Sequence, residues 1–171
     1  ELHLITDGLP VIIAYIDQSH HFLFSNRAHQ EHWGLPRNKI VGHHMLDILG
    51  SDNYERAIPY LDRALAGQHT TFEMSVEYGG LGRRYAKIDY VPHIEKDGSV
   101  AGCFVLAQDL SDKKAAEEER LRLIERYEAL YNKTPVMLHS IDRNGKITNV
   151  SHYWLEVTGY KREEVIGKKS I

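Results

Sequence analysis

The chain has 171 residues, of which 42% are hydrophobic and 26% charged, a composition typical of a folded protein with one domain and part of another. The formal net charge is −3 and the basic residues are scattered, which argues against a nucleic-acid-binding surface. No apolar run approaches the roughly 20 residues that cross a bilayer, so we expect no membrane segment in these residues and a cytoplasmic location. The single cysteine, Cys103, allows no internal disulfide and agrees with a reducing compartment.

The first part of the chain carries short strand and helix signals. Two apolar stretches separated by a polar turn predict a β-hairpin. Asn26 suits the cap of a short helix. A longer helix, which Ser51 or Asp52 would cap, contains Pro59, where we expect a kink. The expected elements are an upstream helix or linker end at 1–8, strands at 11–16 and 21–25, and helices at 26–33, 37–42 and 53–66.

The hydrophobic period changes to two from residue 68 onward. Apolar and polar residues alternate from Phe72 to Val76 and again from Ala86 to Tyr90, on either side of a glycine-rich loop. Residues 100–109 are mostly apolar or β-branched, and they predict a central strand buried on both faces or nearly so. Together with the first hairpin, these segments predict an α+β fold with one five-stranded antiparallel sheet and short helices on one face.

A long helix is predicted directly after the central strand, over residues 111–133. Ser111 is a suitable N-cap, and no Gly or Pro occurs in the rest of the segment. Ala116, Leu123 and Leu130 recur at a seven-residue spacing. Such an apolar stripe needs a partner, so we expect a homodimer through this helix, as a coiled coil; packing on its own sheet is the alternative.

The chain repeats itself at an offset of 125 residues. The matched pairs include Pro10 with Pro135, Val11 with Val136, Ile16 with Ile141, Asp17 with Asp142, Gly34 with Gly159 and Gly42 with Gly167. A repeat of this length indicates tandem domains, because solenoid repeats are shorter than about 50 residues. We therefore expect one complete domain at 9–110 and the truncated start of a second copy at 134–171, joined by the helix.

The sequence resembles the PAS domain family of the bacterial sensory-box type. The matching residues are Asp17, Asn26, Trp33-Gly34, Ile40-Val41-Gly42, the run from Ala64 to Gly67, Tyr90-Val91-Pro92, Asp97-Gly98, Gly102 and the run from Asp109 to Lys114. The last run is similar to the D-I-T-E-R-K ending that leads PAS domains into their output helices, with Leu110 and Ser111 at its second and third positions. The resemblance covers residues 9–114, and 134–171 as the start of a second copy.

The resemblance implies a sensory module of a signal-transduction protein, of the histidine kinase or cyclic-dinucleotide enzyme type. Such a module senses a small ligand or dimerises, and passes the signal through its last strand into the linker helix. Asp109, Leu110 and Ser111 are then the signal joint. A ligand-free module that only holds a dimer is the alternative. The residues show no nucleophile-base set, so we expect no enzymatic activity here; a longer parent chain would carry a downstream output domain such as a kinase or diguanylate cyclase.

The candidate ligand-binding residues are those on the apolar face of the strands, with polar or stacking groups added at the mouth. They are Trp33, His32, Phe72, Met74, Arg84, Ala86, Ile88, Tyr90, Cys103 and Val105. Small inward residues leave room for a ligand, although large neighbours across the sheet would fill the same space and give a solid core. Arg84 would pair with a carboxylate at the pocket mouth.

No cofactor is identifiable from the sequence, although an unknown small molecule fits the pattern. His29 and His32 have a spacing that suits a metal, but no Cys or acidic pair completes a ligand set near them, so we expect no metal. Haem-binding family members carry a histidine on the long helix, and the helix predicted at 53–66 has none. Flavin-photoreceptor members carry Asn-Cys-Arg soon after the glycine that matches Gly42, where this chain continues His-His-Met-Leu. We therefore expect neither haem nor flavin.

Overall fold

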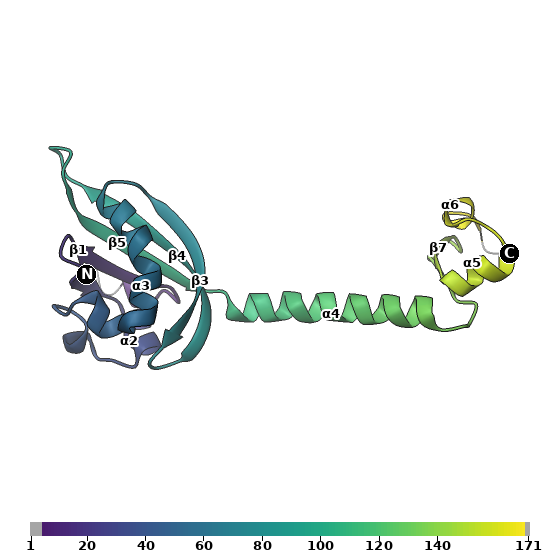
Figure 1. The fold of residues 1–171 in the computed structure, drawn as a ribbon, viewed down its shortest axis with the longest axis horizontal. Helices are drawn as coiled ribbons and strands as arrows, with labels where there is room; N and C mark the ends of the chain where they lie inside the picture. The colour runs from purple at the N-terminus through teal and green to yellow at the C-terminus, as the bar shows by residue number, and fades with distance from the viewer. Residues whose placement is uncertain (1–4, 170–171) are drawn as a thin grey trace. The chain divides into compact units, whose positions relative to one another are not determined.

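The computed structural model describes residues 5–169, which form two compact units that divide between Lys114 and Ala115. The first unit contains a five-stranded antiparallel sheet in the order β2-β1-β5-β4-β3 (Figure 1). Its strands are β1 (Ile12–Asp17), β2 (Phe22–Ser25), β3 (Thr70–Tyr78), β4 (Gly82–Ile94) and β5 (Val100–Asp109). The sheet and the central place of β5 confirm the α+β prediction.

One face of this sheet is covered by α2 (Arg27–Trp33), the 3-10 turn η1 (Arg37–Lys39) and α3 (Met45–Leu65), as Figure 1 shows for the two helices. Asn26 caps α2 as expected, because its Oδ1 accepts from the backbone N of His29, while Gly34 ends the helix with φ 67°. Asn26 also anchors the helix to β1, because Oδ1 accepts from Ile13 N and Nδ2 donates to Val11 O.

The long helix differs from its prediction. It begins at Met45, with His44 as its N-cap, rather than at residue 53. The backbone leaves helical geometry at Gly50, where φ is 73° and ψ 166°, and continues helically through Pro59. The kink therefore lies at Gly50, because glycine enters the left-handed region without a Cβ clash. This early start matters for the site, since Met45 and Leu49 face the sheet.

The central strand is buried on one face only, so the prediction of burial on both faces was wrong. Cys103, Val105 and Ala107 are buried, whereas Phe104 and Leu106 are 42% and 38% exposed. The helices cover a single face of the antiparallel sheet, and the other face meets solvent. There Phe104 packs edge-on to Tyr15 at a ring-centroid distance of 5.0 Å.

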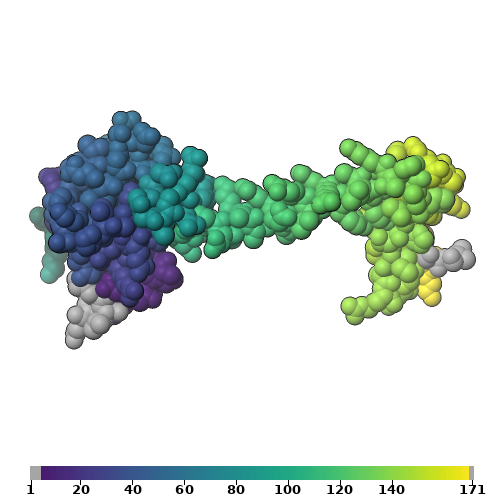
Figure 2. All heavy atoms as spheres, turned by 90° about the horizontal axis from the view of Figure 1, so that it is seen from below, coloured from purple at the N-terminus to yellow at the C-terminus, as the bar shows by residue number. Residues whose placement is uncertain are grey.

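The helix α4 (Ser111–Lys133, green in Figure 2) follows β5 after one residue. Its leucines and Ile124 are exposed, whereas Tyr131 near its end is buried. The second unit adds β6 (His139–Ile141), β7 (Ile147–Val150), α5 (His152–Thr158) and α6 (Arg162–Val165). Its small core consists of Ile147, Val150 and Val165, with Trp154 and Leu155 packed against it. None of the helices within residues 5–169 is both long and apolar enough to cross a membrane.

The sequence repeat is also a repeat of backbone geometry. Asp17 Oδ1 accepts from the backbone N of residues 19 and 21, and Asp142 Oδ1 accepts from those of residues 144 and 146. Gly42 N donates to the carbonyl of residue 22, and Gly167 N to that of residue 147. Both the turn and the closing bond thus recur at the same offset of 125 residues.

Candidate functional site

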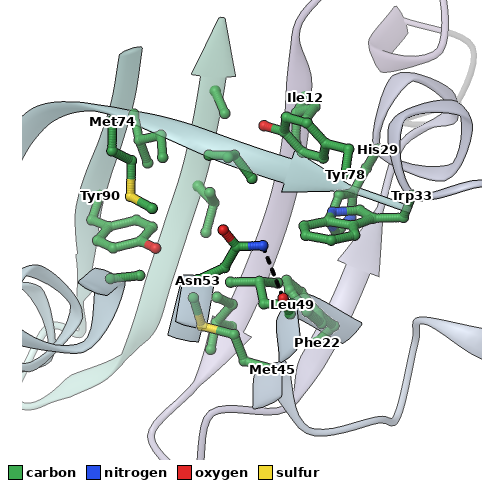
Figure 3. A pocket seen from close by; sticks show the side chains of 16 residues that line it. Ile12, Phe22, His29, Trp33, Met45, Leu49, Asn53, Met74, Tyr78 and Tyr90 are labelled. Atoms are coloured by element: carbon green, nitrogen blue, oxygen red, sulfur yellow. Dashed lines mark hydrogen bonds between the residues drawn. The ribbon is translucent and has the colours of Figure 1, made fainter. Parts of the chain in front are cut away.

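A cavity of about 50 Å³ lies inside the first unit, between the helix-covered face of the sheet and helices α2 and α3. Figure 3 shows Tyr90 and Met74 on one side of it, Tyr78, Trp33 and His29 on the other, and Asn53 between them. The full lining is Ile12, Ile16, Phe22, His29, Trp33, Met45, Leu49, Asn53, Ala57, Met74, Val76, Tyr78, Ile88, Tyr90, Val105 and Ala107.

Half of the candidate binding residues from the sequence lie on this wall: Trp33, Met74, Ile88, Tyr90 and Val105. Three others lie in the surrounding core: Phe72, Ala86 and Cys103. Phe72 stacks on Tyr60, with ring centroids 3.8 Å apart and planes 8° from parallel. The inward face of the strands was therefore assigned correctly, but only part of it borders the cavity.

His32 and Arg84 lie away from the cavity wall. His32 Nδ1 is hydrogen-bonded to Ala28 O at 2.8 Å, and its ring packs edge-on to Tyr78. Arg84 does pair with a carboxylate, because its Nε lies 3.8 Å from Oδ2 of Asp109 at the end of β5, but neither residue lines the cavity. The register explains this, because Arg84 pairs with Val76 across the β3–β4 ladder, at the end of the sheet where β5 leads into the joint.

Residues that sequence reasoning missed supply most of the polar surface of the cavity. Tyr78 continues the inward parity of Phe72, Met74 and Val76, so the alternation itself could have identified it. His29 and Asn53 come from helices, and their inward orientation depends on how those helices pack on the sheet. The other missed lining residues are Ile12, Ile16, Phe22, Met45, Leu49 and Ala57. Val76 and Ala107 were expected on the inward face of the strands, and both line the cavity.

Asn53 is a structural connector at the cavity wall. Its Nδ2 donates to Leu49 O at 2.9 Å and to Glu77 O at 3.0 Å (dashed line to Leu49 in Figure 3). Its Oδ1 accepts from Arg56 Nη2 at 2.8 Å and from Glu77 N at 3.3 Å. The amide therefore joins α3 to β3 and has little capacity left for another partner.

His29 is a neutral group at the wall. It is 3% exposed, and burial, with a smaller contribution from His32, lowers its pKa from 6.5 to about 3. Its Nδ1 is hydrogen-bonded to Ser25 Oγ at 3.0 Å. The imidazole therefore carries no charge at neutral pH, and its Nε2 has no hydrogen bond to any residue that the structure describes.

Two tyrosine hydroxyls and one indole also border the cavity. Tyr78, Tyr90 and Trp33 are 5%, 2% and 7% exposed. Within residues 5–169, the two hydroxyls and the Trp33 Nε1–H make no hydrogen bond. Burial is the main factor that raises the pKa of both tyrosines, so the phenols stay protonated and available as donors. Figure 3 shows the Tyr90 hydroxyl directed into the cavity.

The strand–helix joint begins two residues after the cavity wall ends at Ala107. Leu110 N donates to Tyr85 O at 2.7 Å, Tyr85 N donates to Ser111 Oγ at 2.8 Å, and Ser111 N donates to Asp109 Oδ1 at 2.9 Å. Burial acts to raise the pKa of Asp109, but the Ser111 hydrogen bonds and the Arg84 charge together lower it. These hydrogen bonds thus fix the first residues of α4 to β4 and β5.

Within the described part of the chain, no group of three or more His, Cys, Asp or Glu side chains has an arrangement that suits a metal ion. The rings of His20, His21 and His44 do lie close together, with the His44 ring centroid 5.7 Å from that of His20 and 5.3 Å from that of His21. His20 Nδ1 instead bonds the Tyr54 hydroxyl at 2.8 Å. This group connects the β1–β2 turn to the start of α3.

Known proteins show the same fold. The PAS domain of a Colwellia psychrerythraea protein superposes with a TM-score of 0.57 at 14% identity, over 64% of this chain and 93% of that one. The Vibrio cholera VqmA structure, solved with a ligand and DNA, gives a TM-score of 0.57 at 18% identity, over 66% of this chain and 52% of that one. At these identities the likeness establishes the fold alone.

A relative in sequence is the uncharacterized protein y4lL of Sinorhizobium fredii (strain NBRC 101917 / NGR234), 27% identical over 173 residues. The match covers 98% of this chain, which spans about a fifth of the length of that protein. A family model described as the PAS fold matches residues 6–115, and a second model with that description matches 125–171.

The five-stranded antiparallel sheet with helices on one face is the α+β architecture of the PAS fold. The chain belongs to the PAS family, as its sequence predicted. PAS domains are typically non-catalytic sensory or signalling modules.

Proposed function

We propose that this chain is the sensory part of a bacterial signal-transduction protein, which senses a small molecule in the cavity and passes the change through β5 into α4. The observation that carries the proposal is that one strand, β5, forms part of both the cavity wall and the joint with α4. Val105 and Ala107 of β5 border the cavity, and Asp109 of the same strand holds the first residue of α4. A displacement of the cavity wall would therefore reach the helix through two residues of regular strand.

The proposal includes dimerisation through α4. The helix exposes Leu121, Leu123, Ile124, Tyr127 and Leu130, each by 41% or more. Isolated helices in water need a packed face, and a second copy of the same helix supplies one of matching length and spacing. Leu123→Lys is expected to convert the dimer into a monomer in analytical ultracentrifugation. Glu125→Lys, which adds the same residue on the other side of the helix, should leave it dimeric.

A ligand-free structural module is the second candidate, and the size of the cavity favours it. At about 50 Å³ the cavity is well below the roughly 300–1,000 Å³ of ordinary ligand sites. In that case the domain would hold the dimer and set the position of α4 without sensing. Haem and flavin need far more space than this, so neither belongs to the proposal.

Residues 134–171 would be the start of a second PAS copy, placed downstream of the linker helix. The repeated turn at Asp142, the repeated bond at Gly167 and the family match over residues 125–171 support this. This chain spans about a fifth of the length of its relative, which supports a larger parent. A kinase or cyclic-dinucleotide output domain and a cytoplasmic location are part of the same proposal and rest on the family resemblance alone. We propose no direct role for this chain in nucleic-acid binding, although VqmA, which shares the fold, was solved in complex with DNA.

The test combines ligand retention with an uncoupling variant. Native mass spectrometry of protein purified from its source cells should show a mass above that of the bare chain. Asp109→Ala should abolish the response of the output domain while thermal unfolding stays within a few degrees of the wild type. Asp112→Ala, in the first turn of α4, is the matched control. An Asp109→Ala protein with full output would contradict the proposed route.

A further inference from the structure

We propose that the cavity takes a small, uncharged, flat molecule with hydrogen-bond acceptors, of the class of a single heteroaromatic ring carrying a ring nitrogen or a carbonyl. This inference rests on the proposed sensing role and specifies the chemistry of the ligand. Three properties of the wall carry it: its charge, its unpartnered polar atoms and its shape.

The wall excludes charged ligands. No Asp, Glu, Lys or Arg is among its sixteen residues, and its one histidine is neutral at physiological pH. An ion placed there would lose its hydration without gaining a counter-charge, which costs far more than the hydrogen bonds return. The only amide side chain on the wall, Asn53, already makes four hydrogen bonds and offers no compensation.

The wall supplies three hydrogen-bond donors that have no protein partner in the part of the chain that the structure describes. The hydroxyls of Tyr78 and Tyr90 and the Nε1–H of Trp33 have no hydrogen-bond partner among residues 5–169, although each residue is more than nine-tenths buried. None of these three atoms is completely enclosed by protein, so a molecule inside the cavity, whether water or a ligand, can be their hydrogen-bond partner. A ligand with two or more acceptor atoms satisfies them, whereas a hydrocarbon leaves them unpaired.

The aromatic rings and the methionines set the shape. Trp33 and Tyr78 meet edge-on with centroids 4.8 Å apart, and Tyr90 faces them across the cavity (Figure 3). Such rings favour a flat partner that stacks between them. A cavity of about 150 Å³ holds benzene, so a ring requires expansion beyond about 50 Å³. The unbranched side chains of Met45 and Met74 allow it, because methionine changes rotamer readily.

Three probes separate the alternatives. 2-Pyridone has the proposed chemistry, toluene has a similar size but no polar atoms, and benzoate is an anion. The full chain is titrated with each while its ¹H–¹⁵N spectrum is recorded. The Trp33 indole reports the cavity, Trp154 in the second unit reports non-specific binding, and the Tyr85 and Ser111 amides report the joint. We expect 2-pyridone to bind at least about tenfold more tightly than either competitor.

Tyr90→Phe tests the role of the hydroxyl directly. The variant should weaken 2-pyridone binding roughly three- to tenfold, as loss of one hydrogen bond does, and leave the affinity for toluene unchanged. Because the hydroxyl has no partner among the described residues, the variant should unfold at the same or a higher temperature in the absence of ligand, which a structural role would not allow. Tyr85→Phe, on the opposite face of the same strand, is the matched control.

The outcomes separate the ligand class from the sensing role. Tightest binding by benzoate or toluene, or an unchanged 2-pyridone affinity in Tyr90→Phe, overturns the ligand class alone. Binding of 2-pyridone at Trp33 with no shift at Tyr85 or Ser111 overturns transmission through the joint but keeps the ligand class. If no probe moves the Trp33 resonance at millimolar concentration, the ligand class falls. If native mass spectrometry also finds no retained molecule, the sensing role falls as well.

Discussion

The buried histidine at the cavity wall makes the first domain sensitive to acid. In the unfolded chain His29 has a pKa near 6.5, whereas burial lowers its folded pKa to about 3. Between these two values the unfolded state binds more protons, so stability falls as the pH falls below 6.5. Integration from pH 7 to pH 5 gives a loss of about 2 kcal/mol for this group, since one pKa unit corresponds to about 1.4 kcal/mol.

Urea denaturation of the wild type and of His29→Gln at pH 7, 6 and 5 measures this loss. Gln keeps a polar group beside Ser25 but does not titrate. Between pH 7 and pH 5 the free energy of unfolding of the variant should therefore fall by about 2 kcal/mol less than that of the wild type. His20, whose pKa is also lowered mainly by burial, contributes equally to both proteins and cancels. The exposed His43→Gln serves as control. Equal pH slopes in wild type and His29→Gln would refute the reasoning.

Three further substitutions test the packing around the site. Gly80→Ala should lower the free energy of unfolding, measured by chemical denaturation, by about 1–3 kcal/mol, because the added Cβ would lie 2.6 Å from Glu31 O. Leu81→Ala in the same loop is the control and should have little effect. Asn53→Ala should cost about 2–3 kcal/mol, since it leaves Glu77 N and O unpaired between α3 and β3. Ser111→Ala should cost about 1 kcal/mol and speed hydrogen exchange of the Tyr85 amide; unchanged exchange there would count against the joint.

Period-two alternation predicted the faces of β3 and β4 because in a strand each side chain points opposite to the last. Met74, Ile88 and Tyr90 were therefore placed correctly. Residues 100–109 carry apolar side chains on both faces, so Phe104 and Leu106 look like core residues although they lie on the uncovered face. A continuous apolar run does not reveal whether one or two layers cover a sheet.

The helix-derived part of the wall depends on information that the local sequence does not contain. Asn53 looks like a residue near a helix cap, yet its amide spans to β3, 24 residues away. His29 looks like half of a metal-spaced pair with His32, yet the two rings have different partners, Ser25 and Ala28. Packing of α2 and α3 on the sheet decides which side of each helix borders the cavity.

The only thiol of the chain has a practical consequence for the study of motion. Cys103 is fully buried in the core, and burial raises its pKa to about 12, so it remains protonated and inert toward thiol reagents. Maleimide dyes or nitroxide labels placed on engineered surface cysteines of β5 and α4 would therefore react without background. Distances between the sheet and the helix can then be followed spectroscopically in the otherwise native protein.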